Sequence, residues 1–261
     1  MNQNHTNRFQ DFFKEKKYTT LKNYLYNYQL RKLAVEKHLQ SKNADLILEV
    51  GSGISPVMMK SEDIIYSDLS FSAIQLLKDS HGKGYYVVAD GMNLPFKSGV
   101  FSHAISSEVL EHLSDDRQAL REIARVLKFS GHFIITFPHR KFYFAVDDRF
   151  VGHFRRYEIN EMKDRLKNAG FKPVAIQKVL GPLDKVTMCF AVLCFSIIQK
   201  LKPQKIKAPR KPLIANLISL IFKWGNRYYT ILAWLDARIM PQAVSTILLI
   251  NSILPEKPNA K

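Results

Sequence analysis

Short apolar runs recur through the first half of the chain, and each ends in polar residues or glycine. The first run, 46–50, reads Leu-Ile-Leu-Glu-Val, and four similar runs follow at 64–68, 85–89, 101–106 and 131–137. Unbroken hydrophobicity of this kind is typical of parallel strands that are covered on both faces. Between the last two runs, residues 115–127 place apolar side chains at helical spacing. The pattern predicts an α/β fold that is doubly wound around a parallel sheet.

Four of these runs carry an acid at or just beyond their carboxyl end: Glu49, Asp68, Asp90 and Glu108. Ligands of doubly wound sheets bind beyond the carboxyl ends of the strands. Between the first two acids, Gly51 and Gly53 permit positive φ angles and a close approach of the backbone to a ligand. Asp68 stands at about the spacing of a ribose-binding carboxylate. We therefore expect a nucleoside-type ligand at this edge.

With these ordered blocks, residues 44–180 resemble the class I S-adenosylmethionine-dependent methyltransferases of the ubiquinone/menaquinone-type (methyltransferase type 11) group. The resemblance implies a Rossmann-like sheet of seven strands and S-adenosyl-L-methionine as the cofactor. Gly51 and Gly53 would pass beneath its methionine part, and Glu49 would steady its amino group. Asp68 would take the two ribose hydroxyls, and Asp90 would accept from the adenine amine, with Met92 on the ring. The remaining expected cofactor contacts are Ser52, Leu69, Gly91, Ser107 and Glu108.

The chain departs from the family pattern at Ser102, where many members have an acid after the aromatic residue of the fourth strand. We expect this change to weaken local support and to leave cofactor binding intact. A nicotinamide-dependent Rossmann enzyme is the competing interpretation, but it requires a third glycine where this chain has Ser55-Pro56. A non-catalytic relative is a further alternative, which the intact glycine and acid blocks disfavour.

The resemblance also divides the chain into segments. A helix at 158–169 would precede a sixth strand at 171–179, and the family's seventh, antiparallel strand best matches 244–250. The resulting predicted organisation is an N-terminal helical cap at 1–43, the methyltransferase core at 44–180, an apolar and basic helical insertion at 181–242, and the last strand and tail at 243–261. The cap has apolar and tyrosine residues at helical spacing, which we interpret as packing.

The insertion carries much of the net charge of +16. Residues 199–227 contain eight basic residues and no acid. Three apolar segments flank or interrupt this run, at 186–198, 213–222 and 228–235, and each is shorter than the ~20 residues needed to cross a bilayer. Short apolar helices beside lysines favour an interfacial anchor on an anionic membrane surface. The alternative is a helical pair that packs on the sheet, covers the acceptor as a lid or forms a dimer interface.

These features predict methyl transfer to a hydrophobic acceptor, such as a lipid, an isoprenoid quinone or a lipid-linked glycan precursor, at the cytoplasmic membrane face. A soluble small-molecule acceptor is the alternative. The charge alone would also allow a nucleic acid, but the basic run lies among aliphatic residues rather than stacking aromatics. The polar residues 1–7 predict no signal peptide, and Cys189 and Cys194 are expected to be buried, reduced thiols. Oligomeric state is not predicted.

Acceptor-side chemistry is expected after the fifth strand, with His139, His153, Arg155 and Tyr157 as the candidate catalytic residues. A neutral histidine could remove a proton near pH 7, and an arginine could hold a carboxylate or phosphate of the acceptor. The structural alternatives are that His139 binds a loop carbonyl and that an arginine pairs with Asp147, Asp148 or Glu158 to brace the loop.

A metal is not expected. The weaker alternative is a divalent ion held where three ligand-type side chains fall within one turn and a histidine follows the next strand: Glu108, Glu111, His112 and His139.

Overall fold

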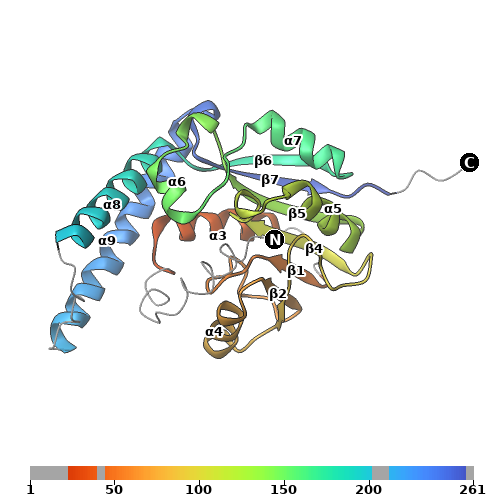
Figure 1. The fold of residues 1–261 in the computed structure, drawn as a ribbon, viewed down its shortest axis with the longest axis horizontal. Coiled ribbons are helices and arrows are strands. Elements are labelled where there is room, and N and C mark those ends of the chain that lie inside the picture. The colour runs from red at the N-terminus through yellow and green to blue at the C-terminus, as the bar shows by residue number, and fades with distance from the viewer. Residues whose placement is uncertain (1–22, 40–44, 202–211, 257–261) are drawn as a thin grey trace, which may run out of the picture.

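A computed structural model describes residues 23–39, 45–201 and 212–256 of the chain. Seven strands form one sheet in the order β3-β2-β1-β4-β5-β7-β6, in which β7 runs antiparallel to both of its neighbours (Figure 1). The strands are β1 (Ile47–Val50), β2 (Ile64–Asp68), β3 (Tyr85–Val88), β4 (Phe101–Ser107), β5 (Leu127–Pro138), β6 (Lys172–Leu180) and β7 (Ile247–Ile253). The predicted doubly wound, Rossmann-like seven-stranded fold is confirmed.

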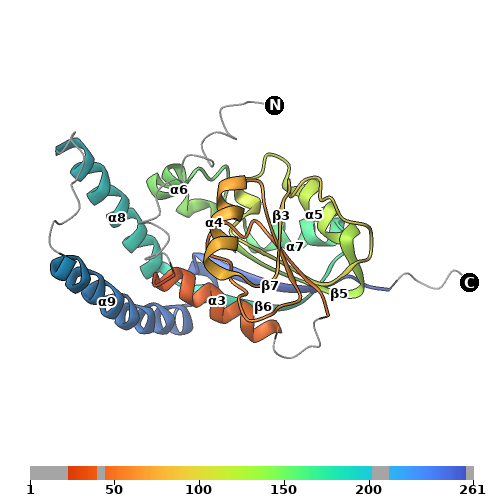
Figure 2. The same ribbon diagram turned by 90° about the horizontal axis from the view of Figure 1, so that it is seen from below.

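Helices cover both faces of this sheet, as Figure 2 shows. Apolar side chains of α5 (Asp116–Val126) and α7 (Ile159–Asn168) share one core with the sheet, and those of α3 (Tyr26–Leu39), α4 (Phe71–His81) and α9 (Pro212–Ile239) share a second. Neighbouring residues of one strand enter different cores: Phe133 and Ile135 belong to the first and Ile134 to the second. Both faces of each strand must therefore be apolar, which is why the runs are unbroken.

Two strands start more than one residue away from the predicted position. β5 begins at Leu127, directly after α5, rather than at 131. β7 begins at Ile247 rather than 244, because residues 242–244 form the short 3-10 helix η3 (Gln242–Val244). Local turn geometry and not hydrophobicity decides these ends, so a pattern of apolar residues alone misplaces them by a few residues.

The insertion between β6 and β7 forms two helices, α8 (Pro182–Leu201) and α9. The prediction of separate apolar segments at 213–222 and 228–235 is wrong, because both lie in α9, which is 28 residues long. Five of the eight basic residues of the predicted run 199–227 lie in 202–211, which is outside the described residues. No helix in the described part of the chain is long and apolar enough to cross a membrane.

The insertion is attached to the rest of the fold at its base. Tyr26 of α3 donates a hydrogen bond to Asp184 of α8 at 2.8 Å, and Thr246 donates to the same carboxylate at 3.0 Å. Lys178 of β6 donates to two carbonyl oxygens at the end of α9. Beyond this base, α8 and α9 diverge from each other and project away from the sheet (Figure 2).

The N-terminal cap is described from residue 23. α3 packs against α9 and β6, and Tyr28 donates its hydroxyl proton to the carbonyl oxygen of Pro56, in the loop after β1, at 2.7 Å. Cys189 and Cys194, both on α8, are free thiols and are half-buried rather than buried.

Candidate functional site

The predicted cofactor residues lie along one edge of the sheet. The strands β3, β2, β1 and β4 are adjacent, parallel and in register, with Val50 beside Ser67 on one side and Ser106 on the other. Asp68 pairs with Val88, so the residues that follow β3 reach the same edge. The structure therefore brings together the ends of all four strands that carry the acids Glu49, Asp68, Asp90 and Glu108.

The turn after β1 depends on its two glycines for different reasons. Gly51 has φ +72°, and a Cβ built on it would lie 2.4 Å from Cγ2 of Val109, in the loop after β4. Gly53 has φ +54°, but no atom of the described residues would lie within 4 Å of its Cβ. Gly51 thus allows two loops to pack together, whereas Gly53 presents an open backbone, as a ligand that rests on this turn requires.

Asp68 fixes this turn from the neighbouring strand. Its Oδ2 accepts a hydrogen bond from the backbone N–H of Gly53, and its Oδ1 accepts one from that of Ser70, both at 2.8 Å. These two contacts fix the orientation of the Asp68 carboxylate beside the glycine turn. Leu69, the next residue, is exposed.

Asp90 is held in a similar way. Its Oδ1 accepts from the backbone N–H of Met92 at 2.9 Å, and its carbonyl accepts from Asn93, which closes a turn beyond β3. Gly91 inside this turn lies against Val50: a Cβ built on it would be 3.1 Å from that side chain. The turn therefore sits directly beside the end of β1.

Glu49 is buried beneath the loop that follows β1. Its two carboxylate oxygens accept from the backbone N–H groups of Val57 at 2.8 Å and Met58 at 3.2 Å. Burial raises the pKa of Glu49 to about 8, although these two hydrogen bonds oppose the shift. Glu49 thus braces the loop after the glycine turn. Its predicted contact with a cofactor amino group stays a prediction.

The end of β4 is unusual in its backbone. Glu108 is a non-glycine residue with φ +56°, a strained conformation that is found mostly where function requires it. Its Oε1 is buried without a hydrogen-bond partner in the described part of the chain, as is Oγ of Ser52 across the edge. Ser107 next to it is bonded to Thr136 of β5 at 2.9 Å. The strained turn therefore leaves buried oxygens of Glu108 and Ser52 at this edge for a ligand to satisfy.

His139, directly after β5, binds a loop carbonyl, which was the predicted structural alternative to a catalytic role. Its Nδ1 donates to the carbonyl oxygen of Ser245 at 2.9 Å, and its Nε2 is buried without a hydrogen-bond partner among the residues described. Burial lowers the pKa of His139, which keeps the ring neutral at physiological pH.

The predicted residue Arg155 and its neighbour Arg156 both form ion pairs that brace the structure. Arg156 is buried and donates to Asp148 at 2.7 Å, as the structural alternative proposed. Arg155 pairs with Asp116 at 3.1 Å, and the hydroxyl of Tyr157 donates to the same carboxylate at 2.7 Å. Asp116 is the first residue of α5 and Tyr157 is fully buried in the core, so these contacts brace the start of α5. The predicted roles of Arg155 and Tyr157 toward the acceptor stay predictions.

A buried charge network that the sequence did not predict lies behind this region. Lys185 of α8 contacts both oxygens of Asp147, at 2.6 and 2.8 Å, and Asp148 at 2.7 Å. The two acids belong to α6 (Val146–Val151), so the network attaches the insertion to the loop after β5. Burial opposes the ionisation of Asp148, but hydrogen bonds from His153 and Lys185 and the charge of Arg156 lower its pKa. In the sequence, the one sign of this network is the charged pair Asp184-Lys185 at the start of the apolar segment 186–198.

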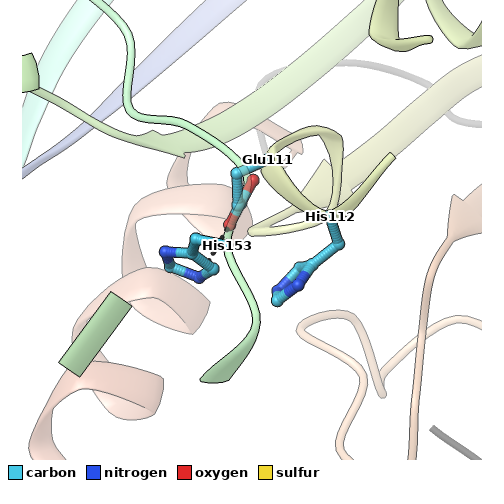
Figure 3. A group of neighbouring side chains, drawn as sticks. All are labelled: Glu111, His112 and His153. Atoms are coloured by element: carbon cyan, nitrogen blue, oxygen red, sulfur yellow. Dashed lines mark ion pairs between the residues drawn. The ribbon is translucent and has the colours of Figure 1, made fainter. Parts of the chain in front are cut away.

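The side chain of His153 lies beside the segment that follows β4. Its Nδ1 lies 2.9 Å from Asp148 Oδ1, and its Nε2 lies 3.7 Å from Oε1 of Glu111. Figure 3 shows these two side chains with His112 beside them. Of the four residues considered as metal ligands, the structure brings together Glu111 and His112, and it adds His153 in place of Glu108 and His139.

Comparison with known proteins agrees with this geometry. Residues 48–135 match the family model Methyltransf_11, described as a methyltransferase domain. The chain is 31% identical over 104 residues to a demethylmenaquinone methyltransferase of Corynebacterium kroppenstedtii, which covers 39% of this chain and 45% of that protein. It is 27% identical over 128 residues to a probable S-adenosylmethionine-dependent methyltransferase of Mycobacterium tuberculosis, covering 48% and 47%. The chain thus spans about half the length of these curated relatives.

Among solved structures, a putative methyltransferase of Bacillus halodurans superposes with a TM-score of 0.55 at 16% identity, covering 85% of this chain and 98% of that one. At this identity the match supports the fold alone. Because this match covers 85% of the chain, the fold resemblance extends beyond residue 135, where the family model no longer matches.

Proposed function

We propose that this chain, which carries a class I S-adenosylmethionine-dependent methyltransferase domain, transfers a methyl group to an apolar acceptor at an anionic membrane surface. The acceptor class is an isoprenoid quinone, a lipid or a lipid-linked glycan precursor. The observation that carries the proposal is the exposed apolar surface of the insertion. The demethylmenaquinone methyltransferases among its relatives support a quinone in particular.

Both helices of the insertion expose apolar side chains at helical spacing. On α8 these are Val186, Phe190, Leu193 and Ile197. On α9 they are Leu220, Ile221, Trp224, Tyr228, Ile231, Leu232, Trp234, Leu235 and Ile239. Phe190 is 68% exposed and Ile239 is 73% exposed. Side chains spaced by three, four and seven residues share one face of a helix, so each helix presents an apolar stripe.

Cationic side chains accompany the stripe on α9. The guanidinium groups of Arg227 and Arg238 lie 5.9 and 5.2 Å from the ring centres of Trp224 and Trp234. An aromatic ring beside a cation suits the boundary between acyl chains and anionic headgroups, where both groups are stabilised. Both arginines and the basic run of residues 199–227 carry positive charge, which attracts anionic headgroups. This combination favours an anionic membrane over a second protein copy as the partner.

Catalysis at this site would depend mainly on alignment. When bound, S-adenosylmethionine supplies a methyl group that is already activated on a sulfonium. The chain's own residues orient the donor: the Gly51–Gly53 turn supports one end, and Asp68 and Asp90 would bind the sugar and the purine. Orientation of two reactants can contribute about 7–11 kcal/mol to the lowering of a barrier.

The proposal is tested by two measurements on the full chain. The first is methyl transfer from labelled S-adenosylmethionine to a demethylated menaquinone that carries its isoprenoid tail, compared with the tail-less head group. We expect product from the tailed acceptor and little from the head group. Equal turnover of both would support the soluble small-molecule alternative.

The second measurement is cosedimentation with phosphatidylglycerol vesicles at low salt. We expect the wild type to bind, and the Phe190→Ser/Trp224→Ser double variant to bind at least about tenfold more weakly, because burying each side chain is worth about 1.5–3 kcal/mol when complete. Tyr85→Ser is the matched control, since Tyr85 is 61% exposed on the opposite edge strand β3. Equal binding of the double variant would exclude the insertion as the membrane contact.

A further inference from the structure

Three side chains with metal-ligating atoms converge beside the cofactor edge. One ligand atom from each of Glu111, His112 and His153 lies within 4.8 Å of the others. Figure 3 shows the Glu111 carboxylate directed toward the His153 ring, with the His112 ring on its other side. Glu111 and His112 belong to the 3-10 helix η1 (Leu110–His112), which follows β4. His153 reaches them because the backbone N–H of Phe154 donates to the carbonyl oxygen of Glu111 at 2.9 Å.

Glu111 is the most unusual member of this group. Its side chain is fully buried, yet neither carboxylate oxygen has a hydrogen-bond partner among the described residues. Buried polar groups in folded proteins are almost always satisfied, and an unsatisfied buried carboxylate is costly. The separation of 3.7 Å from His153 Nε2 is too long for a hydrogen bond. Within the described part of the chain, no donor therefore satisfies either oxygen of Glu111.

His153 is oriented as a ligand would be. Its Nδ1 is bonded to Asp148, and that carboxylate is held in turn by Arg156 at 2.7 Å and Lys185 at 2.7 Å. The remaining ring nitrogen, Nε2, faces Glu111. Metal-bound histidines usually donate their second N–H to a carboxylate, which fixes the tautomer and the direction of the ring. Asp148, Arg156 and Lys185 lie outside the three-residue cluster, so His153 is oriented by groups other than Glu111 and His112.

We propose that Glu111, His112 and His153 bind a divalent transition-metal ion. Two imidazoles and one carboxylate match the donors that Zn²⁺ and Fe²⁺ take in open, three-ligand protein sites, and they suit Mg²⁺ or Ca²⁺ poorly. A metal ion supplies the positive charge that the buried Glu111 lacks. Three protein ligands leave a position open for an oxygen of the acceptor. The proposed site is independent of the membrane contact and of the acceptor's identity.

The test uses the full chain, freed of metal with a chelator and then dialysed. Zn²⁺ binding is measured by competition with a chromophoric indicator, and Co²⁺ is added separately to record its absorption spectrum. We expect one Zn²⁺ per chain and a visible Co²⁺ band that Zn²⁺ abolishes. Mg²⁺ should not displace Zn²⁺. S-adenosylhomocysteine binding should persist without the metal, which separates this proposal from the cofactor assignment.

Variants localise the site. Glu111→Gln and His153→Asn should each weaken Zn²⁺ binding by more than about 100-fold, and Asp148→Asn by about 10–100-fold, as expected for a residue that orients a ligand. His81→Asn, at the end of α4, is the control and should bind as the wild type does. If a variant does not fold, the Co²⁺ spectrum of the wild type tests the proposal: a visible band that Zn²⁺ abolishes supports the site, and no such band contradicts it. No stoichiometric Zn²⁺ in the wild type, or equal affinity in folded Glu111→Gln, would overturn the proposal.

Discussion

Alanine substitutions at Gly51 and Gly53 should separate the packing role of the turn after β1 from its ligand-facing role. Both residues have positive φ, so an alanine at either position pays a backbone strain of about 1–2 kcal/mol. At Gly51 the new Cβ would also lie 2.4 Å from Cγ2 and 2.8 Å from Cγ1 of Val109. Overpacking of this kind costs about 1–3 kcal/mol more. We expect Gly51→Ala to lower the free energy of unfolding by about 2–5 kcal/mol and Gly53→Ala by about 1–2 kcal/mol.

The assay is urea denaturation followed by far-UV circular dichroism, together with calorimetric titration of S-adenosylhomocysteine. Val109→Ala should restore part of the stability in the Gly51→Ala background, because it removes the two nearest atoms. Gly53→Ala should lower ligand affinity at least about tenfold despite its small effect on stability, since its Cβ would enter space open to the ligand. Equal destabilisation by the two alanines, or no recovery with Val109→Ala, would refute the packing argument. Unchanged affinity in Gly53→Ala would refute the ligand-facing role.

Three further predictions concern stability and catalysis. Burial raises the pKa of Glu49 to about 8, so its contribution to stability is fully present below pH ~4.5 and is lost as pH rises toward 8. In urea titrations, the free energy of unfolding of the wild type relative to Glu49→Gln should therefore fall across that pH range. A constant difference would contradict the raised pKa. Tyr157→Phe should lower the free energy of unfolding by about 1–2 kcal/mol but leave kcat within about twofold, because its hydroxyl binds Asp116 in the core; a large loss of kcat would restore the catalytic interpretation. Lys185→Met should cost about 3–5 kcal/mol, because it leaves Asp147 and Asp148 buried with less compensation; a loss below 1 kcal/mol in thermal or urea unfolding would show that the network is dispensable.

The strands and the acids at their ends could be predicted from the sequence because the relevant signals are local. Buried parallel strands need unbroken apolar runs, and the acids follow those runs directly, so sheet topology alone brings Glu49, Asp68 and Asp90 to one edge. The contacts that fix these acids, such as that of Asp68 with the backbone of Gly53, follow from the turn geometry and became visible only in the structure.

Partners from distant parts of the chain could not be predicted in this way. Arg155 was predicted to contact the acceptor, and its ion pair with Asp116 at the start of α5 could not be foreseen from the sequence. His139 was grouped with Glu111 because it follows the next strand, yet the loop bond of Phe154 brings His153 there instead. Charge and residue type identify candidates for pairing, whereas the choice among them depends on loop paths that carry no periodic signal.

The length of α9 shows a different limit. Residues 213–222 and 228–235 were predicted to be separate apolar segments, but both lie in α9, and Gly225 lies between them. A single glycine in an exposed helix costs only about 1 kcal/mol, which the packing of α9 on α3 and β6 offsets. Helix propensity is a weak signal where tertiary contacts hold both sides of such a break.

The binding of S-adenosylhomocysteine tests the central claim most directly, namely that the carboxyl ends of β1, β2 and β3 bind the cofactor with Asp68 on its sugar. Isothermal titration should show one site per chain in the wild type. Asp68→Ala should lose about 1.5–3 kcal/mol of binding, roughly a 10- to 150-fold weaker Kd, whereas Asp79→Ala, at an exposed position of α4, should bind as the wild type does. Absence of binding in the wild type, or an unchanged affinity in Asp68→Ala, would contradict the account.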